Sequence, residues 1–316
     1  MSSLKESEKK TEGLKKFINN IEKEKPTNFL KLFFSYRNNR TGNYISFQPV
    51  ISNDVQHEIF NAIVPYIKQQ LSNNHPADYS PMGVLDGYFE IMDTQEVVGA
   101  NKFFESVSRE LLLRDLSEMK PEKIGFYCIE IKHNEKAAYI FRQFQKMKKL
   151  RNGFFCQLFD SQLRIVENIL GFDQLSDIII FENDLFLLNH IALERIFYYR
   201  DEIQKKADEA IREIKNKNII VNVDSFSTDC LNDVRIMKRF TSLMTSGRLP
   251  LFFEHYSDVP GIVKQLDLDI QFDGENKLIY REKSQLFHIV NLLSDAYFES
   301  LLAKRTGIAL VEGEIK

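Results

Sequence analysis

Apolar and polar positions along the chain follow helical spacing in several segments. Within residues 1–25, the apolar positions 14, 17, 18 and 21 lie on one face of a helix, which we expect to end before Pro26. Further amphipathic helices are predicted over residues 58–71, 101–119, 191–214 and 284–302. Each has a polar outer face, so each is expected to pack its other face on a core.

Other segments have the alternating or short apolar pattern of strands. Strands are predicted over residues 84–91, 123–133, 137–144, 178–181, 185–188, 266–272 and 277–280. Turn residues separate three of the pairs, at Asn134-Glu135, Glu182-Asn-Asp184 and Asp273-Gly274, which indicates hairpins. The pattern therefore predicts an α+β fold, with a mixed or antiparallel sheet, hairpins and packed amphipathic helices.

Chain length and turn signals predict how the chain divides into domains. Its 316 residues suit about two subdomains. Arg151-Asn-Gly153 is a turn signal after a run of charge, and it is the predicted internal boundary. We expect a charged N-terminal helical segment over residues 1–25, an N-terminal α+β domain over 26–152 and a C-terminal α+β domain over 153–316.

Composition excludes several classes of protein. No window has the roughly 20 apolar residues that a membrane helix needs, and residues 1–10 lack the apolar stretch of a secretory signal. The three cysteines are widely spaced, which is typical of a reducing compartment and indicates neither a disulfide framework nor a zinc site. We therefore expect a cytoplasmic protein, and predict no metal and no cofactor.

The second half of the chain resembles a known family. The run from Phe172 to Asn189, FDQLSDIIIFENDLFLLN, is followed three residues later by LERIF over residues 193–197. Near the C-terminus, residues 293–300 read LSDAYFES and fit the same pattern. This resembles the KwaB family, the soluble component of the two-gene Kiwa anti-phage defence system, and is clearest over about residues 150–302.

The resemblance implies a role that composition does not. A KwaB-like protein would act in the bacterial cytosol, bind DNA to restrict phage replication and form a homodimer. It would work with a small integral-membrane partner, KwaA, and could be recruited through it to the inner face of the membrane. The C-terminal domain over 153–316 would then be the KwaB-like domain.

The distribution of charge points independently to a polyanion. Residues 136–159 hold six basic residues and no acid, and residues 234–253 hold four and no acid, although the whole chain carries a net charge of −3. Aromatic residues are interleaved, as in surfaces on which bases stack. The predicted phosphate contacts are Lys146, Lys148, Lys149, Arg151, Lys238 and Arg239. The alternative is that the aromatics are core and the cations form a solvated face.

Two further hypotheses remain open. Glu130 and Lys132 share a face near the end of a predicted strand, and Glu-x-Lys resembles half the motif of Mg²⁺-dependent restriction-type nucleases. Such an enzyme needs an upstream aspartate, for which Asp86 and Asp115 are available without the usual Pro-Asp context. A non-enzymatic DNA-binding protein is favoured over this nuclease. The third hypothesis is a protein-interaction adaptor with exposed Phe-rich faces and no affinity for nucleic acid.

Overall fold

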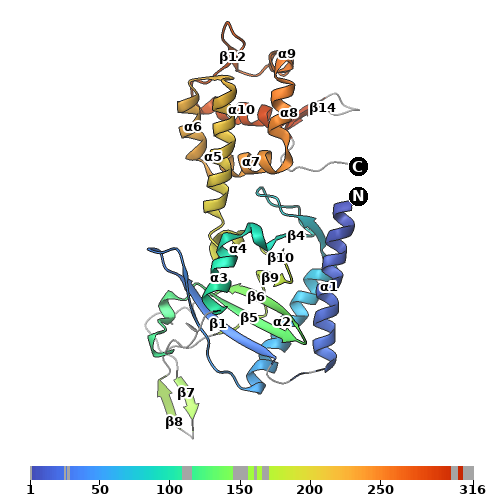
Figure 1. Ribbon diagram of the computed structural model, residues 1–316, viewed down its shortest axis with the longest axis vertical. Coiled ribbons are helices and arrows are strands. Elements are labelled where there is room, and N and C mark those ends of the chain that lie inside the picture. The colour runs from blue at the N-terminus through green and yellow to red at the C-terminus, as the bar shows by residue number, and fades with distance from the viewer. Residues whose placement is uncertain are drawn as a thin grey trace. The chain divides into compact units, whose positions relative to one another are not determined.

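The structure is a computed structural model that describes residues 2–24, 26, 29–108, 116–144, 156–159, 162–165, 171–299 and 305–308. The chain forms two compact units (Figure 1). The first comprises Met1–Tyr79 and Asp86–Tyr199, and the second comprises Ser80–Leu85 and Arg200–Lys316.

An eight-stranded sheet forms the centre of the first unit, in the order β2-β1-β5-β6-β9-β10-β4-β3. Its strands span Leu30–Arg37 (β1), Tyr44–Phe47 (β2), His75–Asp78 (β3), Tyr88–Asp93 (β4), Phe126–His133 (β5), Lys136–Gln143 (β6), Ile178–Phe181 (β9) and Asp184–Leu187 (β10). Neighbours are antiparallel except β3 and β4, which are parallel. The hairpins predicted around residues 134–135 and 182–184 are confirmed, and so is the α+β class with a mixed sheet.

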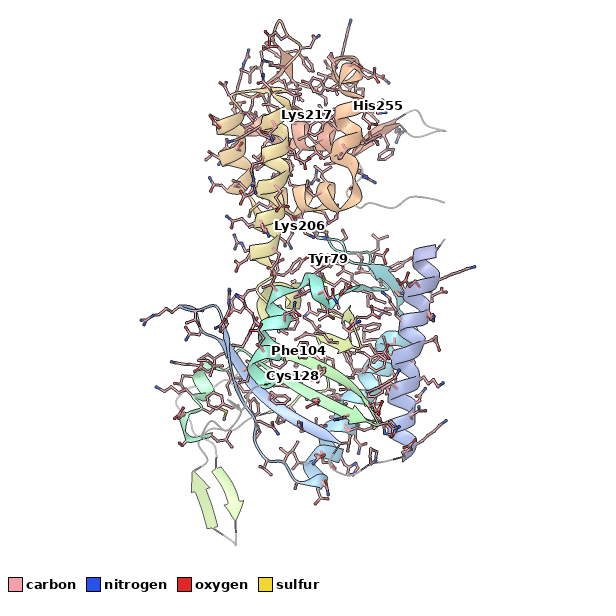
Figure 2. The ribbon with its side chains drawn as sticks, in the orientation of Figure 1. Tyr79, Phe104, Cys128, Lys206, Lys217 and His255 are labelled. Carbon is pink, nitrogen blue, oxygen red and sulfur yellow. The ribbon has the colours of Figure 1, made fainter. Side chains whose placement is uncertain are left out.

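Helices cover both faces of this sheet. On one face, α1 (Ser2–Glu24) and α2 (Asn53–Asn73) bury apolar residues against β5 residues such as Ile129. On the other face lie α3 (Val98–Ser108) and α4 (His190–Ile196), where Phe103 of α3 packs 5.0 Å from the ring centre of Phe141. Cys128 of β5 is enclosed in this sheet (Figure 2), and burial raises the pKa of its thiol.

The second unit is mainly helical, with small sheets. Its helices span Arg200–Lys217 (α5), Val223–Leu231 (α6), Val234–Ser246 (α7), Arg248–Glu254 (α8), Val259–Gln265 (α9) and Leu286–Leu293 (α10). Its strands span Ile220–Val221 (β11), Gln271–Phe272 (β12), Leu278–Ile279 (β13), Tyr297–Glu299 (β14) and Thr306–Ile308 (β15). β12 and β13 are antiparallel, which confirms the hairpin predicted at Asp273-Gly274. The core lies between α5 and α7, where Ile203, Ile214 and Phe240 are fully buried.

Shorter elements complete the described chain. The hairpin of β7 (Cys156–Phe159) and β8 (Gln162–Ile165) is a separate two-stranded sheet. Turns of 3-10 helix span Thr94–Glu96 (η1), Leu116–Glu118 (η3), Pro121–Lys123 (η4), Tyr256–Asp258 (η5) and Lys283–Gln285 (η6). The helix predicted over residues 101–119 overlaps α3 and η3, and residues 109–115 between them lie outside the described residues.

Two predicted helices differ from the observed ones. The pattern over residues 191–214 is divided between α4 and α5, because Tyr198 has φ of +58° and no helix continues through that backbone conformation. The pattern over 284–302 yields α10, which ends at Leu293, and Asp295 then has φ of +48° before β14. In both cases apolar spacing continued across a break that only the backbone angles reveal.

The predicted boundary at residues 152–153 also differs from the observed division. β6 pairs with β9, so that Ala138 lies opposite Phe181, and segments on both sides of residue 152 therefore belong to one sheet. The two units instead divide between Tyr199 and Arg200. Residues 1–25 are not a separate segment, since α1 contributes Leu14 and Ile21 to the core of the first unit. The turn signal Arg151-Asn-Gly153 lies outside the described residues.

Candidate nucleic-acid interface

Helix α7 carries three cations beside the residues that it buries in the core. Asp233 caps its first turn, where the carboxylate accepts a hydrogen bond of 2.9 Å from the backbone N–H of Arg235. The helix ends at Gly247, whose φ of +69° is the left-handed conformation that glycine adopts without strain. Its buried residues are Ile236, Met237, Phe240, Thr241, Ser242 and Leu243. Among the cations at positions 235, 238 and 239, Arg235 is exposed and the other two are half-buried.

These cations lie beside an aromatic ring from another helix. Arg235, Lys238 and Arg239 are spaced i, i+3 and i+4, so they share one face of α7. Phe287 of α10 is 38% exposed, and the guanidinium carbons of Arg235 and Arg239 lie 5.5 and 5.9 Å from its ring centre. Both distances are within cation–π range. We call these four residues the α7–α10 basic face; α7 and α10 are in contact (Figure 1).

Neighbouring groups set the charge of this face. The side chain of Arg235 donates a hydrogen bond of 3.1 Å to the carboxylate of Asp233, and this contact lowers the pKa of Asp233. Burial lowers the pKa of Arg239, although a guanidinium stays protonated at neutral pH. Arg239 also donates a hydrogen bond to the side-chain oxygen of the buried Asn291. Arg235 is thus paired with an acid at the surface, and Arg239 is held in place by a buried side chain.

The structure brings only part of the predicted site together. Lys238 and Arg239 are neighbours on α7, within this face. Lys146, Lys148, Lys149 and Arg151 lie outside the described residues, so their role as phosphate contacts stays a prediction.

In the basic run over residues 136–159, the structure describes the side chains of residues 136–144, and the cations among them form ion pairs. Arg142 is buried and donates hydrogen bonds to Asp177 at 2.9 Å and to Asp173 at 2.6 Å. Lys136 pairs with Glu182 at 2.5 Å, and Phe141 is fully buried. Within residues 136–144, the burial of Phe141 and the ion pairs of Lys136 and Arg142 agree with the alternative of core aromatics and paired cations.

Glu130 and Lys132 share a face of β5, as predicted, but differ in surroundings. The carboxylate of Glu130 lies 3.4 Å from the ammonium of Lys31, and accepts a hydrogen bond of 3.4 Å from the hydroxyl of Tyr139. Burial raises the pKa of Tyr139 to about 12, so this hydroxyl stays protonated. Lys132 is exposed. Across the described part of the chain, no three His, Cys, Asp or Glu residues gather where they could hold a metal ion.

Two residues of the α7–α10 basic face were not predicted as site residues. The i, i+3, i+4 spacing of three cations on a helix was the available signal for Arg235. Phe287 had no such signal, because its position beside α7 depends on how α10 packs. The contribution of an exposed ring from a distant segment therefore required the tertiary structure.

The fold and the α7–α10 basic face define a two-unit α+β protein with a cationic helical surface. A family model described as Kiwa protein KwaB-like matches residues 121–303, which is more than half of the chain. The chain therefore belongs to the KwaB-like family and is a component of Kiwa anti-phage defence. The match contains β5, β6, β9, β10 and the whole α7–α10 basic face.

Two comparisons found no relative. No curated protein and no solved structure matches the chain. Among the helices in the described residues, none combines the length and the apolar character required to cross a membrane.

Proposed function

We propose that this chain is a non-enzymatic subunit of Kiwa defence that binds DNA largely without sequence preference. The observation that carries the proposal is the α7–α10 basic face, where two guanidinium groups flank a partly exposed phenylalanine ring. Its third cation, Lys238, lies on the same side of α7.

This combination suits the chemistry of DNA in two ways. Cations at helical spacing can follow the phosphate backbone, which supplies most sequence-independent affinity through release of counterions. An exposed ring with neighbouring arginines can stack on any base, because every base has a π-face. Neither contact distinguishes one base from another, so little sequence preference is expected.

Membership of the family supports the proposed partners. A Kiwa component is expected to work with other proteins of that system, and we propose the membrane protein KwaA as a partner and a homodimer as the assembly. The protein would then act in the cytoplasm, at the inner face of the membrane. Co-purification with KwaA in detergent and sedimentation of the purified chain test these two proposals separately.

A DNA titration at two salt concentrations tests the DNA-binding proposal. Replacing Arg235 and Lys238 by Gln removes two positive charges from the α7–α10 basic face. We expect DNA binding several-fold weaker at low salt, and a slope of log affinity against log salt that is smaller by about 2. Arg239 is left unchanged because it holds the buried Asn291.

A matched control separates local contacts from net charge. Lys205 and Arg212 are exposed on α5 in the same unit, so their double replacement by Gln removes the same charge elsewhere. Equal losses in the two double variants would reject the α7–α10 basic face as the site. Affinity that does not depend on salt would reject phosphate binding altogether.

The same titration, repeated with Mg²⁺, covers the two other hypotheses. Cleavage of DNA by the unmodified chain only when Mg²⁺ is present, and no cleavage by the Glu130→Ala variant, would favour the nuclease hypothesis. If the chain does not bind DNA at all, the protein-interaction adaptor is the remaining hypothesis. Intact DNA with salt-sensitive binding is the result that the proposal expects.

A further inference from the structure

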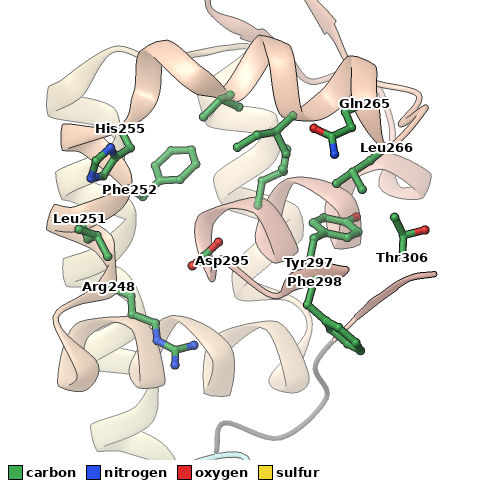
Figure 3. Close-up of a pocket in the computed structure, with 13 residues that line it drawn as sticks. Arg248, Leu251, Phe252, His255, Gln265, Leu266, Asp295, Tyr297, Phe298 and Thr306 are labelled. Carbon is green, nitrogen blue, oxygen red and sulfur yellow. The ribbon is translucent and has the colours of Figure 1, made fainter. Parts of the chain in front are cut away.

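The second unit contains a cavity that the DNA-binding proposal does not use. It has a volume of about 330 Å³ and lies among α8, α9, α10 and the β14–β15 hairpin (Figure 3). This volume lies at the lower end of the range for small-molecule sites in proteins, about 300–1,000 Å³. The cavity is large enough for one compact ligand, and too small for a folded partner.

Aromatic rings from different elements form its walls. Phe252 of α8 and Tyr297 of β14 lie on opposite sides of the cavity, and Phe298 lies at its edge (Figure 3). Aliphatic side chains from α8, α9 and α10 supply the rest of the apolar lining, with Leu266 beside them. Flat rings on two sides favour a flat ligand, because stacked or edge-on ring contacts are stronger than burial alone.

Polar groups of both kinds face the same space. Gln265 offers an amide that donates and accepts, and Asp295 offers a carboxylate that accepts (Figure 3). Arg248 places positive charge at one end, where it also donates a hydrogen bond of 3.3 Å to the Ser294 carbonyl. Gln265 and Asp295 are exposed, so water can pair with them until a ligand that carries both donors and acceptors takes its place.

We propose that this cavity binds a nucleobase, with the ring between Phe252 and Tyr297 and its polar edge toward Gln265 and Asp295. A nucleobase is flat and carries N–H donors and carbonyl or ring-nitrogen acceptors, which matches a lining that has both. The base can belong to a free nucleotide or to an unpaired nucleotide of a nucleic acid. The two sources share this chemistry, and the experiment below separates them.

A chain of side chains connects the cavity to the α7–α10 basic face. The hydroxyl of Tyr297 lies 2.8 Å from Nδ1 of His288, one residue beyond Phe287 on α10. Asn291 contacts both Tyr297 and Arg239 through side-chain hydrogen bonds. A base in the cavity would therefore lie one buried asparagine away from a cation of the face. The cavity nevertheless stands as a site without the face, because no residue of the face lines it.

Trp fluorescence provides the test, because the chain has no Trp. Leu251 is 48% exposed at the rim of the cavity, so Leu251→Trp places a single reporter there. We expect saturable quenching of this Trp by adenosine, guanosine, cytidine or thymidine, or by their 5′-monophosphates. Binding should be at least about fivefold weaker when Phe252→Leu is added, because a stacking ring is lost.

Phe253→Leu is the matched control, since Phe253 is the next residue of α8 and does not line this cavity. Equal affinity in the Phe252→Leu and Phe253→Leu backgrounds would overturn the proposal, and so would the absence of saturable quenching by every nucleoside, nucleotide and oligonucleotide. Quenching by mononucleotides assigns the site to a free nucleotide. Quenching only by single-stranded oligonucleotides, and not by blunt duplex, assigns it to an unpaired base.

A fatty acid probe and the charge variant complete the design. Quenching by decanoate without any response to bases would also overturn the proposal. In the reporter chain carrying Arg235→Gln and Lys238→Gln, quenching by mononucleotides should persist. Loss of DNA affinity in that variant then reports on the DNA-binding face, and the mononucleotide response reports on the cavity.

Discussion

Asp233 shows how a single side chain serves both folding and charge. Its carboxylate caps α7 and also pairs with Arg235, so one negative group stabilises the helix start and reduces the positive charge of the proposed DNA-binding face. A capping side chain contributes about 0.5–2 kcal/mol. The exposed ion pair contributes less, because water and salt screen it.

Replacing Asp233 separates these two effects. Asp233→Asn keeps a capping oxygen and removes the charge, so we expect tighter DNA binding at low salt with little change in stability. Asp233→Ala should also bind DNA more tightly, but should lose about 1 kcal/mol of unfolding free energy. Urea unfolding and DNA titration of both variants measure the two effects. Asn and Ala variants of equal stability would contradict the cap.

The pH dependence of Asp233 has a definite sign. The pKa of its carboxyl is lower in the folded chain than its ordinary value of 3.8. Its contribution to stability is therefore complete above about pH 4 and is lost as the pH falls through the folded pKa. Asp233→Asn should remove that part of the acid destabilisation. The unfolding free energies of the two chains at pH 7 and at low pH test this sign.

At the scale of elements, close approach between helices depends on one glycine. A Cβ atom on Gly99, at the start of α3, would lie 2.1 Å from the carbonyl oxygen of Phe197, directly after α4. No side chain occupies such a space, so α3 can reach this position only with glycine. The aromatic cluster between the sheet and these helices, including Phe103 and Phe197, relies on that approach.

We expect Gly99→Ala to destabilise the chain by about 1–3 kcal/mol, since the backbone must shift to relieve the overlap. Gly261→Ala on α9 is the control, because nothing lies within 4 Å of the added Cβ. That substitution should be neutral or stabilise by up to about 1 kcal/mol. Chemical unfolding of both variants measures the contrast, and two variants of similar stability would contradict the close packing.

At the scale of the whole molecule, each unit has its own buried core. In the first unit, Asp177 ties β6, β9 and the start of α4 together, because its carboxylate accepts from Arg142, from the backbone of Gln143 and from Asn189. Asp177 is 2% exposed, whereas Asp173, the second acid beside Arg142, is 40% exposed. The second unit is built around α5 and α7 instead.

Removing Asp177 should therefore act on one unit. We expect Asp177→Ala to cost about 3–5 kcal/mol, because Arg142 is left buried without its inner partner. Hydrogen exchange should rise in β6, β9 and β10 and stay unchanged in α5 and α7. Asp173→Ala, at the solvent-exposed end of the same network, should cost clearly less. A uniform rise in exchange over both units would show that they unfold together.

Local patterns in the sequence determined much of the fold. The helix over residues 14–21, the strands around the turns at 134–135 and 182–184, and the buried stripe of α5 were all predicted, because burial on one face imposes a period on neighbouring residues. The α+β class followed from these elements, and the KwaB-like resemblance lay in residues 172–197. Lys238 and Arg239 were predicted as phosphate contacts, and both lie on the face that we propose to bind DNA.

The tertiary structure decided the features that depend on backbone angles and on contacts between distant segments. Apolar spacing continued through Tyr198, although the backbone breaks there, because periodicity does not report φ. The sheet joined strands on both sides of residue 152, since strand pairing depends on contacts far apart in sequence. The same reason explains why Arg142 became a buried structural cation, and why Phe287 and the cavity beside Tyr297 could be found only once α7, α8 and α10 were packed.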